Sequence, residues 1–184
     1  MATIFPGTTI EVTALQKGAS KQLFDGVFAA GGITLSQVAV MTGLEPHVIQ
    51  NWVKRGFLTS PVKRLYSRDQ FARIIIINML RESLQIDRIC GLLHVIGGEL
   101  YDPDDDLISD EELYHRYVDM LSDKDIDLLN EMSVMRAAER AAEGFNEPVA
   151  GAKLKLCKLL KVMFYAHAAS RLRDKAGEIL ATLQ

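Results

Sequence analysis

The sequence predicts an all-α fold with a small β-wing and a C-terminal helical bundle that ends in a long helix. Apolar residues recur at three- and four-residue spacing along most of the 184-residue chain, which is the period of an amphipathic helix. Capping residues and glycines divide the first half into short helices. After Asn146-Glu147-Pro148 the apolar spacing continues to about Leu183, so we expect one long final helix there.

Residues 1–18 show no clear periodicity, so we expect a lead-in that is either ordered or loose. A short helix is expected from Lys21 to Ala30, where apolar residues lie at helical spacing. Gly31-Gly32 ends this helix, because glycine is a poor helix former.

Two short helices joined by a glycine turn are expected next. Thr34 can cap a helix that continues to Met41, with Gln37 as the reciprocal capping residue. Gly43 suits the turn that closes this helix, and Pro46 suits the first turn of the following one. The second helix has an apolar inner face and stops near Gly56. Helix, turn and helix in this order form a helix-turn-helix unit.

A small β-wing is expected over residues 57–66. Two short apolar stretches, Phe57-Leu58 and Leu65-Tyr66, lie on either side of a basic, turn-forming tip. Ser67 can cap the next helix, which runs to about Ser83. Another helix is expected from Asp87 to about Ile96, ended by the glycines at 97 and 98.

The second half is expected to be helical apart from an acidic loop at residues 102–106. Ser109-Asp110-Glu111-Glu112 reads as a capping box that opens a helix to about Leu121. Ser122-Asp123 is expected to cap a further helix, from Lys124 to about Gly144. We therefore divide the chain into a lead-in with a short helix (1–32), a winged helix-turn-helix unit (33–98) and a helical C-terminal region (99–184).

The net charge of −3 hides an uneven distribution of charge along the chain. Residues 33–90 contain eight basic and four acidic side chains, which gives +4. Residues 99–147 contain 16 acidic and four basic side chains, which gives −12, whereas residues 151–184 carry +5 from seven bases and two acids. A basic module followed by an acidic one suits a nucleic-acid-binding surface better than the net charge alone indicates.

Several other classes of protein are disfavoured by the sequence. No segment reaches the ~20 apolar residues of a membrane span, and the first residues lack the pattern of a signal peptide, so a cytoplasmic location is expected. Two cysteines do not make a disulfide scaffold. No nucleophile with a base at motif spacing and no glycine-rich phosphate loop is present, so we expect no enzymatic activity and no cofactor.

Two groups of residues imitate metal sites without completing them. Cys90 and His94 share a helix face, but two ligands with no partner motif do not make a zinc site. Three aspartates in the 102–106 stretch match the opening of an EF-hand loop, but Leu107 and Leu113 stand where that loop needs Gly and Glu. We therefore expect no metal.

Five segments of the helix-turn-helix unit and wing form a pattern of fixed order and spacing: Thr34-Leu35-Ser36-Gln37-Val38-Ala39, Thr42-Gly43-Leu44, Val48-Ile49-Gln50-Asn51-Trp52, Arg55-Gly56-Phe57-Leu58 and Tyr66-Ser67. Together they resemble the N-terminal domain of MerR-type regulators. The resemblance covers about a third of the chain, including the wing and the two helices behind it. The whole chain also resembles an uncharacterised family of bacterial MerR-like proteins, in which the Ile-Ile-Ile-Asn-Met-Leu helix recurs.

The resemblance implies a transcription regulator that binds double-stranded DNA as a homodimer, with helix 46–55 in the major groove and the wing on the backbone. MerR-type domains usually carry Arg-Tyr-Tyr where this chain has Gln50-Asn51-Trp52. Gln and Asn can still pair with adenine edges, so base reading survives the change. Trp52 and Tyr66 fall on apolar faces and are expected in the core, although the Tyr66 hydroxyl can reach a phosphate. The expected DNA-binding residues are His47, Gln50, Asn51, Lys54, Arg55, Lys63, Arg64, Tyr66 and Arg68.

Two other functions stay open at this point. The missing arginine and the acidic second half favour a protein–protein interaction module that has kept the helix-turn-helix fold without binding DNA. The apolar, helical region 99–184 favours a regulator that senses an unidentified small-molecule effector. Whether or not the regulator senses an effector, the long final helix is the first candidate for the dimer interface.

Overall fold

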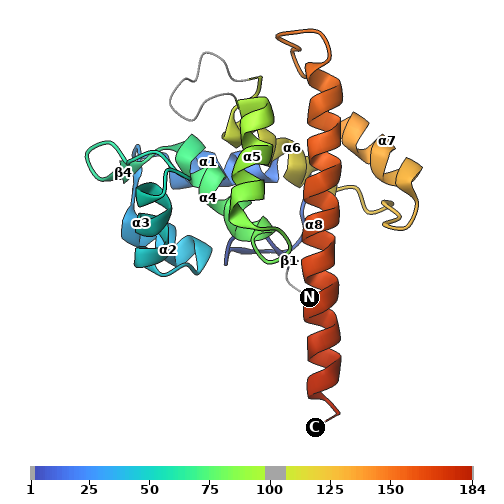
Figure 1. Cartoon of the computed structure of the whole chain (residues 1–184), viewed down its shortest axis with the longest axis horizontal. Helices are drawn as coiled ribbons and strands as arrows, with labels where there is room; N and C mark the ends of the chain where they lie inside the picture. Colours follow the sequence, from blue (N-terminus) through green and yellow to red (C-terminus); the bar gives the residue numbers. More distant parts are fainter. Residues whose placement is uncertain (1–2, 98–106, 184) are drawn as a thin grey trace.

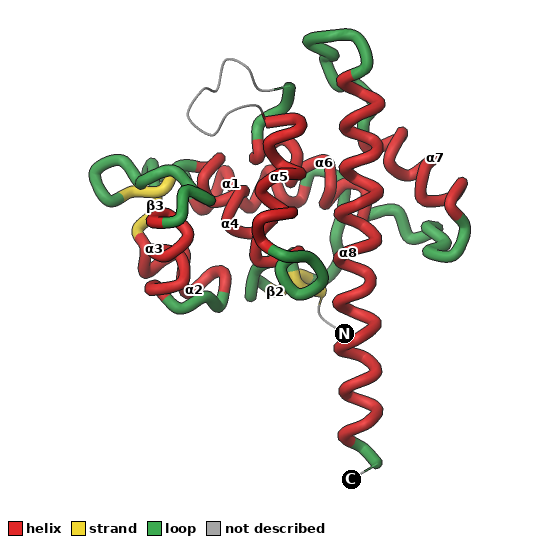
Figure 2. The backbone as a smooth tube through the Cα atoms, in the orientation of Figure 1, coloured by secondary structure: helices red, strands yellow, loops and turns green. Residues whose placement is uncertain are grey.

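The computed structural model describes residues 3–97 and 107–183, and α-helices make up most of them (Figure 1 and Figure 2). The prediction of a mainly helical chain is confirmed. The strands are two residues each: β1 (Thr3–Ile4), β2 (Glu11–Val12), β3 (Ile33–Thr34) and β4 (Leu65–Tyr66). The helices are α1 (Ala19–Val27), α2 (Leu35–Thr42), α3 (Pro46–Lys54), α4 (Arg68–Leu80), α5 (Ile86–Gly97), α6 (Asp110–Leu121), α7 (Glu131–Ala141) and α8 (Ala152–Ala181).

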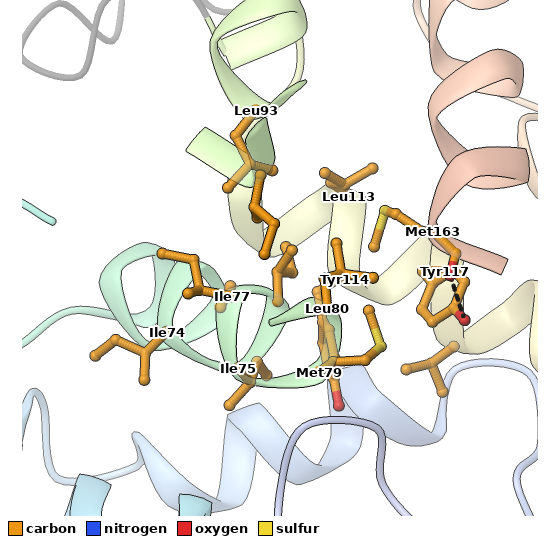
Figure 3. Close-up of a cluster of buried hydrophobic side chains, with 14 of the residues drawn as sticks. Ile74, Ile75, Ile77, Met79, Leu80, Leu93, Leu113, Tyr114, Tyr117 and Met163 are labelled. Carbon is orange, nitrogen blue, oxygen red and sulfur yellow. Dashed lines mark hydrogen bonds between the residues drawn. The ribbon is translucent and has the colours of Figure 1, made fainter. Parts of the chain in front are cut away.

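Helix α4 lies at the centre of the hydrophobic core. Its four consecutive isoleucines, Ile74–Ile77, are all fully buried, which is only consistent with a helix that is surrounded by neighbours. Helices α2, α5, α6 and α8 all contact it. Figure 3 shows three of these isoleucines together with residues of α6 and α8; the labelled side chains include Ile74, Ile75, Ile77, Leu113, Tyr114 and Met163. The core is therefore continuous from the N-terminal helices to α8.

Helix α8 has two halves in different surroundings. In the first half, Leu156, Leu160 and Met163 are buried against the rest of the molecule. From Arg171 onward every described residue is exposed, and the helix extends beyond the body of the protein (Figure 1). Among the described residues, no helix combines the length and apolar character needed to cross a membrane.

Within residues 3–18, β1 and β2 form an antiparallel hairpin, so the described part of the lead-in is ordered. The segment also binds three helices. The Thr9 amide donates to the Met41 carbonyl at the end of α2 (2.8 Å), and the Tyr114 hydroxyl of α6 donates to the Pro6 carbonyl (2.9 Å). The Asn78 side chain of α4 donates to the Gly7 carbonyl (3.0 Å). The contacting residues lie far apart in the sequence, so no local sequence pattern predicts these contacts.

The wing differs from the prediction in its pairing. The partner of β4 is β3, with Ile33 opposite Tyr66, and not the stretch Phe57-Leu58. Phe57 and Leu58 are buried in the core instead. The carbonyl of Phe57 accepts a hydrogen bond from the Arg73 side chain (3.0 Å), which keeps this stretch against α4.

The predicted starts of α2 and α4 are correct, and the predicted starts of α7 and α8 lie several residues too early. The capping boxes of Thr34 with Gln37 and of Ser67 with Gln70 are both present. Helix α7 begins at Glu131 instead of Lys124, because the Asn130 side chain accepts from two amides of its first turn. Helix α8 begins at Ala152, after Gly151 in a left-handed conformation, instead of at 146–148.

Two further helices end before the expected residue: α1 ends at Val27 instead of Ala30, and α4 ends at Leu80 instead of Ser83. The predicted acidic loop at 102–106, and Gly98, lie outside the described residues.

Candidate nucleic-acid interface

Helix α3 presents one apolar and one polar face. Ile49 and Trp52 are buried, and they lie three residues apart on the inner side of the helix. The side chains on the opposite face are exposed and follow the spacing of a single helical stripe. They are His47, Gln50, Asn51 and Lys54. The sequence therefore predicted the outer face of α3 correctly, and these four residues point to solvent together.

A basic two-residue turn lies beside this helix. The amide of Leu65 donates to the carbonyl of Val62 (2.9 Å), and the residues between them, Lys63 and Arg64, have φ of 51° and 66°. Positive φ at both central positions is the pattern of a type I′ turn, which normally carries Asn or Gly because other side chains are strained there. Both basic side chains are exposed. The β3–β4 pair holds this tip in place.

A groove of about 500 Å³ lies between α3 and the tip. Its floor is apolar, with Leu35, Val53, Pro61 and the Tyr66 ring, and its polar lining consists of Gln50, Lys54 and Arg64. Leu35 and Pro61 were not among the predicted site residues, since nothing in the local sequence distinguishes a groove floor from ordinary core.

Arg55 is held at the C-terminal end of α3. Its guanidinium carbon lies 4.5 Å from the centroid of the Phe57 ring, a cation–π contact that orients the charge without neutralising it. The side chain stays exposed. The face formed by α3, Arg55 and the tip therefore combines four permanent positive charges with amide side chains, and Glu45, the N-cap of α3, is the acidic residue next to it.

Two predicted residues are not part of this face. Tyr66 is only 2% exposed, and burial raises the pKa of its hydroxyl. Arg68 bonds to Glu111 (2.8 Å) and to Asp25 (2.9 Å). Burial alone would lower the pKa of Arg68, but the two carboxylates outweigh burial and raise it. Arg68 thus ties α1 and α6 to the start of α4, and its charge is already paired.

Gln70 supports the site in a way that the sequence does not reveal. Besides completing the capping box of α4, its amide nitrogen donates to the carbonyl and hydroxyl of Thr59 and to the carbonyl of Ser60. These three bonds fix the loop that leads into the tip.

A buried ion pair joins this region to α6. Arg73 of α4 donates to Asp110, the first residue of α6, at 2.8 Å, and both residues are below 10% exposed. Burial raises the pKa of Asp110 to about 6, and the charge of Arg73 acts in the opposite direction. Asp69 adds a second link, because its carboxylate accepts from the amide of Glu111 (3.0 Å).

The described residues contain no group of three or more His, Cys, Asp or Glu side chains that could hold a metal ion. Cys90 is half-buried, which raises the pKa of its thiol, and His94 is exposed on the same helix. Asp102, Asp104 and Asp106 of the EF-hand-like stretch lie outside the described residues.

Residues 31–117 match the family model of a domain of unknown function, DUF1836. The matched segment begins just before β3 and ends within α6, so it contains α3, the basic tip and the Arg73–Asp110 pair. Neither a curated protein nor a solved structure matches the chain.

Proposed function

We propose that this protein is a DNA-binding transcription regulator, in which β3 to β4 form a MerR-like winged helix-turn-helix. The observation that carries the proposal is the exposed stripe of amides and cations on α3 next to a strained basic tip. An α-helix fits the major groove of B-DNA, and phosphates on either side of that groove attract cations that flank the helix.

Each group on the face has a role that follows from its chemistry. Gln50 and Asn51 offer the paired donor and acceptor that read an adenine edge. Lys54 and Arg55, at the end of α3, contact phosphates, which fix the position of the helix without reading sequence. Lys63 and Arg64 reach the neighbouring backbone or the minor groove. Tyr66 and Arg68 support the fold of the face rather than bind DNA.

The protein acts as a dimer of two copies of the chain through α8. Six exposed apolar residues of this helix, together with Leu183 just beyond its end, follow one another at alternating spacings of three and four, which is the heptad pattern of a two-stranded coiled coil. Leu154 and Leu180 are also exposed and fall outside this stripe. The full set of apolar residues in α8 obscures this pattern, because it also includes the residues that face the core. The exposed heptad positions are Val162, Tyr165, Ala169, Leu172, Ala176, Ile179 and Leu183. A two-fold dimer places two copies of α3 on two half-sites of one operator.

The test is a titration of the full chain with duplex DNA from its own upstream region, followed by fluorescence anisotropy at several salt concentrations. Lys63→Gln with Arg64→Gln should lower the salt slope by about 2, since each phosphate contact contributes about 0.9. Gln50→Ala should change the preferred sequence with little change in slope. Lys155→Gln, which removes one exposed charge from α8, is the matched control and should bind like the unaltered protein. Absence of a complex at low salt would refute the proposal.

The groove beside the tip favours a second candidate function, a protein-interaction module. Its apolar floor of Leu35, Val53 and Pro61 can accept an apolar side chain of a partner as readily as the edge of a DNA backbone. A stable partner protein recovered with the full chain, together with no DNA affinity at low salt, would favour this function.

A further inference from the structure

A second pocket lies on the other side of the molecule, between the N-terminal hairpin, the end of α6 and the middle of α8. Its volume is about 260 Å³. Pro6, Leu121, Phe164 and Ala168 give it apolar walls, and its two ionisable side chains are His167 and Arg171. No acidic residue is among the described residues that line it. The pocket is thus apolar with a basic end.

His167 is oriented by α6. The Tyr117 hydroxyl lies 2.9 Å from Nδ1 of His167, and a longer contact of 3.4 Å joins the same hydroxyl to the Met163 carbonyl (Figure 3). Burial, with a smaller contribution from the charge of Arg171, lowers the pKa of His167 to about 4, so the ring is neutral at pH 7. In the tautomer whose Nδ1 accepts a hydrogen bond from the Tyr117 hydroxyl, the proton of the neutral ring lies on Nε2. In this tautomer Nε2 is an N–H donor, and its nitrogen forms no hydrogen bond with the described residues.

Arg171 lies one turn further along the same side of α8. It forms no hydrogen bond or ion pair with any described residue, unlike Arg173, which binds Glu82. Its positive charge is close enough to lower the pKa of His167. A guanidinium that has no ion pair with the described residues and a neutral imidazole N–H, at the end of an apolar pocket, form a donor set that suits a carboxylate.

We propose that this pocket binds a small organic carboxylate with a compact apolar body. The carboxylate pairs with Arg171 and accepts a hydrogen bond from Nε2 of His167, and the body packs on Phe164 and the other apolar walls. The volume equals that of about nine water molecules in the liquid, which corresponds to a ligand of about nine non-hydrogen atoms. Benzoate and medium-chain fatty acids have this size and chemistry. A cation would be repelled by Arg171 at the basic end, and bare phosphate has no apolar part to pack on the walls.

The position of the pocket gives its occupant a structural consequence. It bridges α6 and α8 at the point where α8 leaves the body of the protein, so an occupant would stiffen the joint between the core and the exposed half of the helix (Figure 1). The proposal rests on the pocket alone and not on the proposed DNA binding, so either can fail without the other.

The experiment is calorimetric or NMR titration of the full chain with benzoate, phenylacetate and hexanoate, and with benzamide and benzylamine as uncharged and cationic counterparts. At least one carboxylate should bind with a Kd on the order of 1 mM or tighter, as expected for about nine ligand atoms. Benzamide and benzylamine should bind at least about tenfold more weakly, because they lack the charge-assisted contact with Arg171.

Variants separate the carboxylate contact from general effects on the fold. Arg171→Gln should weaken binding at least about tenfold, and Arg171→Lys should restore part of it. Ala168→Leu fills the pocket and should abolish binding with both donors still present. Lys158→Gln removes an exposed charge elsewhere on α8 and should leave binding unchanged. Lack of saturable binding by every carboxylate, equal binding of benzamide, or full binding by Arg171→Gln would each overturn the proposal.

Discussion

Replacement of the tip residues by Asn-Gly, as Lys63→Asn with Arg64→Gly, should make the protein more stable and a poorer DNA binder. Both residues hold a positive φ, which costs on the order of 1–3 kcal/mol for a side chain other than Gly. Asn tolerates this conformation and Gly adopts it freely, but Gly also raises the entropy of the unfolded chain by about 0.4–1 kcal/mol. The net gain should be about 1 kcal/mol, or about 2–4 °C in Tm for a chain of this size.

The assay is urea unfolding followed by the fluorescence of Trp52, which is buried in α3 and is the single tryptophan of the chain. Lys63→Gln with Arg64→Gln is the matched control, since it removes the same charges without relieving the backbone. The control should lose DNA affinity and gain no stability. Equal stabilisation of both variants would mean that charge repulsion, and not φ, strains the turn, and an unchanged midpoint for Asn-Gly would refute the reasoning altogether.

Three further outcomes are expected. Arg73→Met leaves Asp110 buried without its partner and should lower the free energy of unfolding in urea by about 3–5 kcal/mol. Adding Asp110→Leu should restore part of this stability, and a double variant no more stable than Arg73→Met would contradict the prediction. His167 is neutral in the fold down to about pH 4 but protonates near 6.5 when unfolded, so its contribution to stability is lost as the pH falls through that window. Asp110, whose pKa is about 6 in the fold and 3.8 when unfolded, has the opposite effect, because its contribution to stability rises as the pH falls from about 6 to 4. Both proteins retain Asp110, so a comparison with His167→Gln isolates the effect of His167. In parallel urea titrations, the stability of His167→Gln relative to the unaltered protein should be higher at about pH 4.5 than at about pH 7.5. Ile179→Glu should convert a dimer into a folded monomer in sedimentation, because this side chain is 54% exposed and contributes little to the core of one chain; an unchanged mass would exclude the α8 stripe as the interface.

The parts of the fold that follow from the sequence are those set by neighbouring residues. The capping box of Thr34 and Gln37, the left-handed Gly43 and the first-turn Pro46 each depend on a few residues, and all three occur as predicted. The outer face of α3 follows equally from helical spacing. These local features were sufficient to locate the candidate interface.

The parts that could not be predicted depend on contacts between distant segments. Arg68 reads as a free cation in the sequence, but its partners, Asp25 and Glu111, lie 43 residues away on either side. The burial of Tyr66 was expected from its apolar surroundings in the sequence, but the pairing of β4 with β3 that accompanies it was not. The heptad stripe of α8 became visible only when its core-facing residues were separated from its exposed ones.

The central position of α4 has a consequence for the synthesis of the protein. Its apolar surface is covered in part by α8, whose first residue, Ala152, follows the end of α4 at Leu80 by 72 residues. At about 5–20 residues per second, a ribosome needs about 4–14 s to make that length. During this interval the part of α4 that contacts α8 stays uncovered in the nascent chain, and an exposed apolar surface is of the kind that chaperones and proteases recognise. A chain whose translation stops early is therefore expected to be degraded, so that α3 and the basic tip accumulate only in molecules that also carry α8.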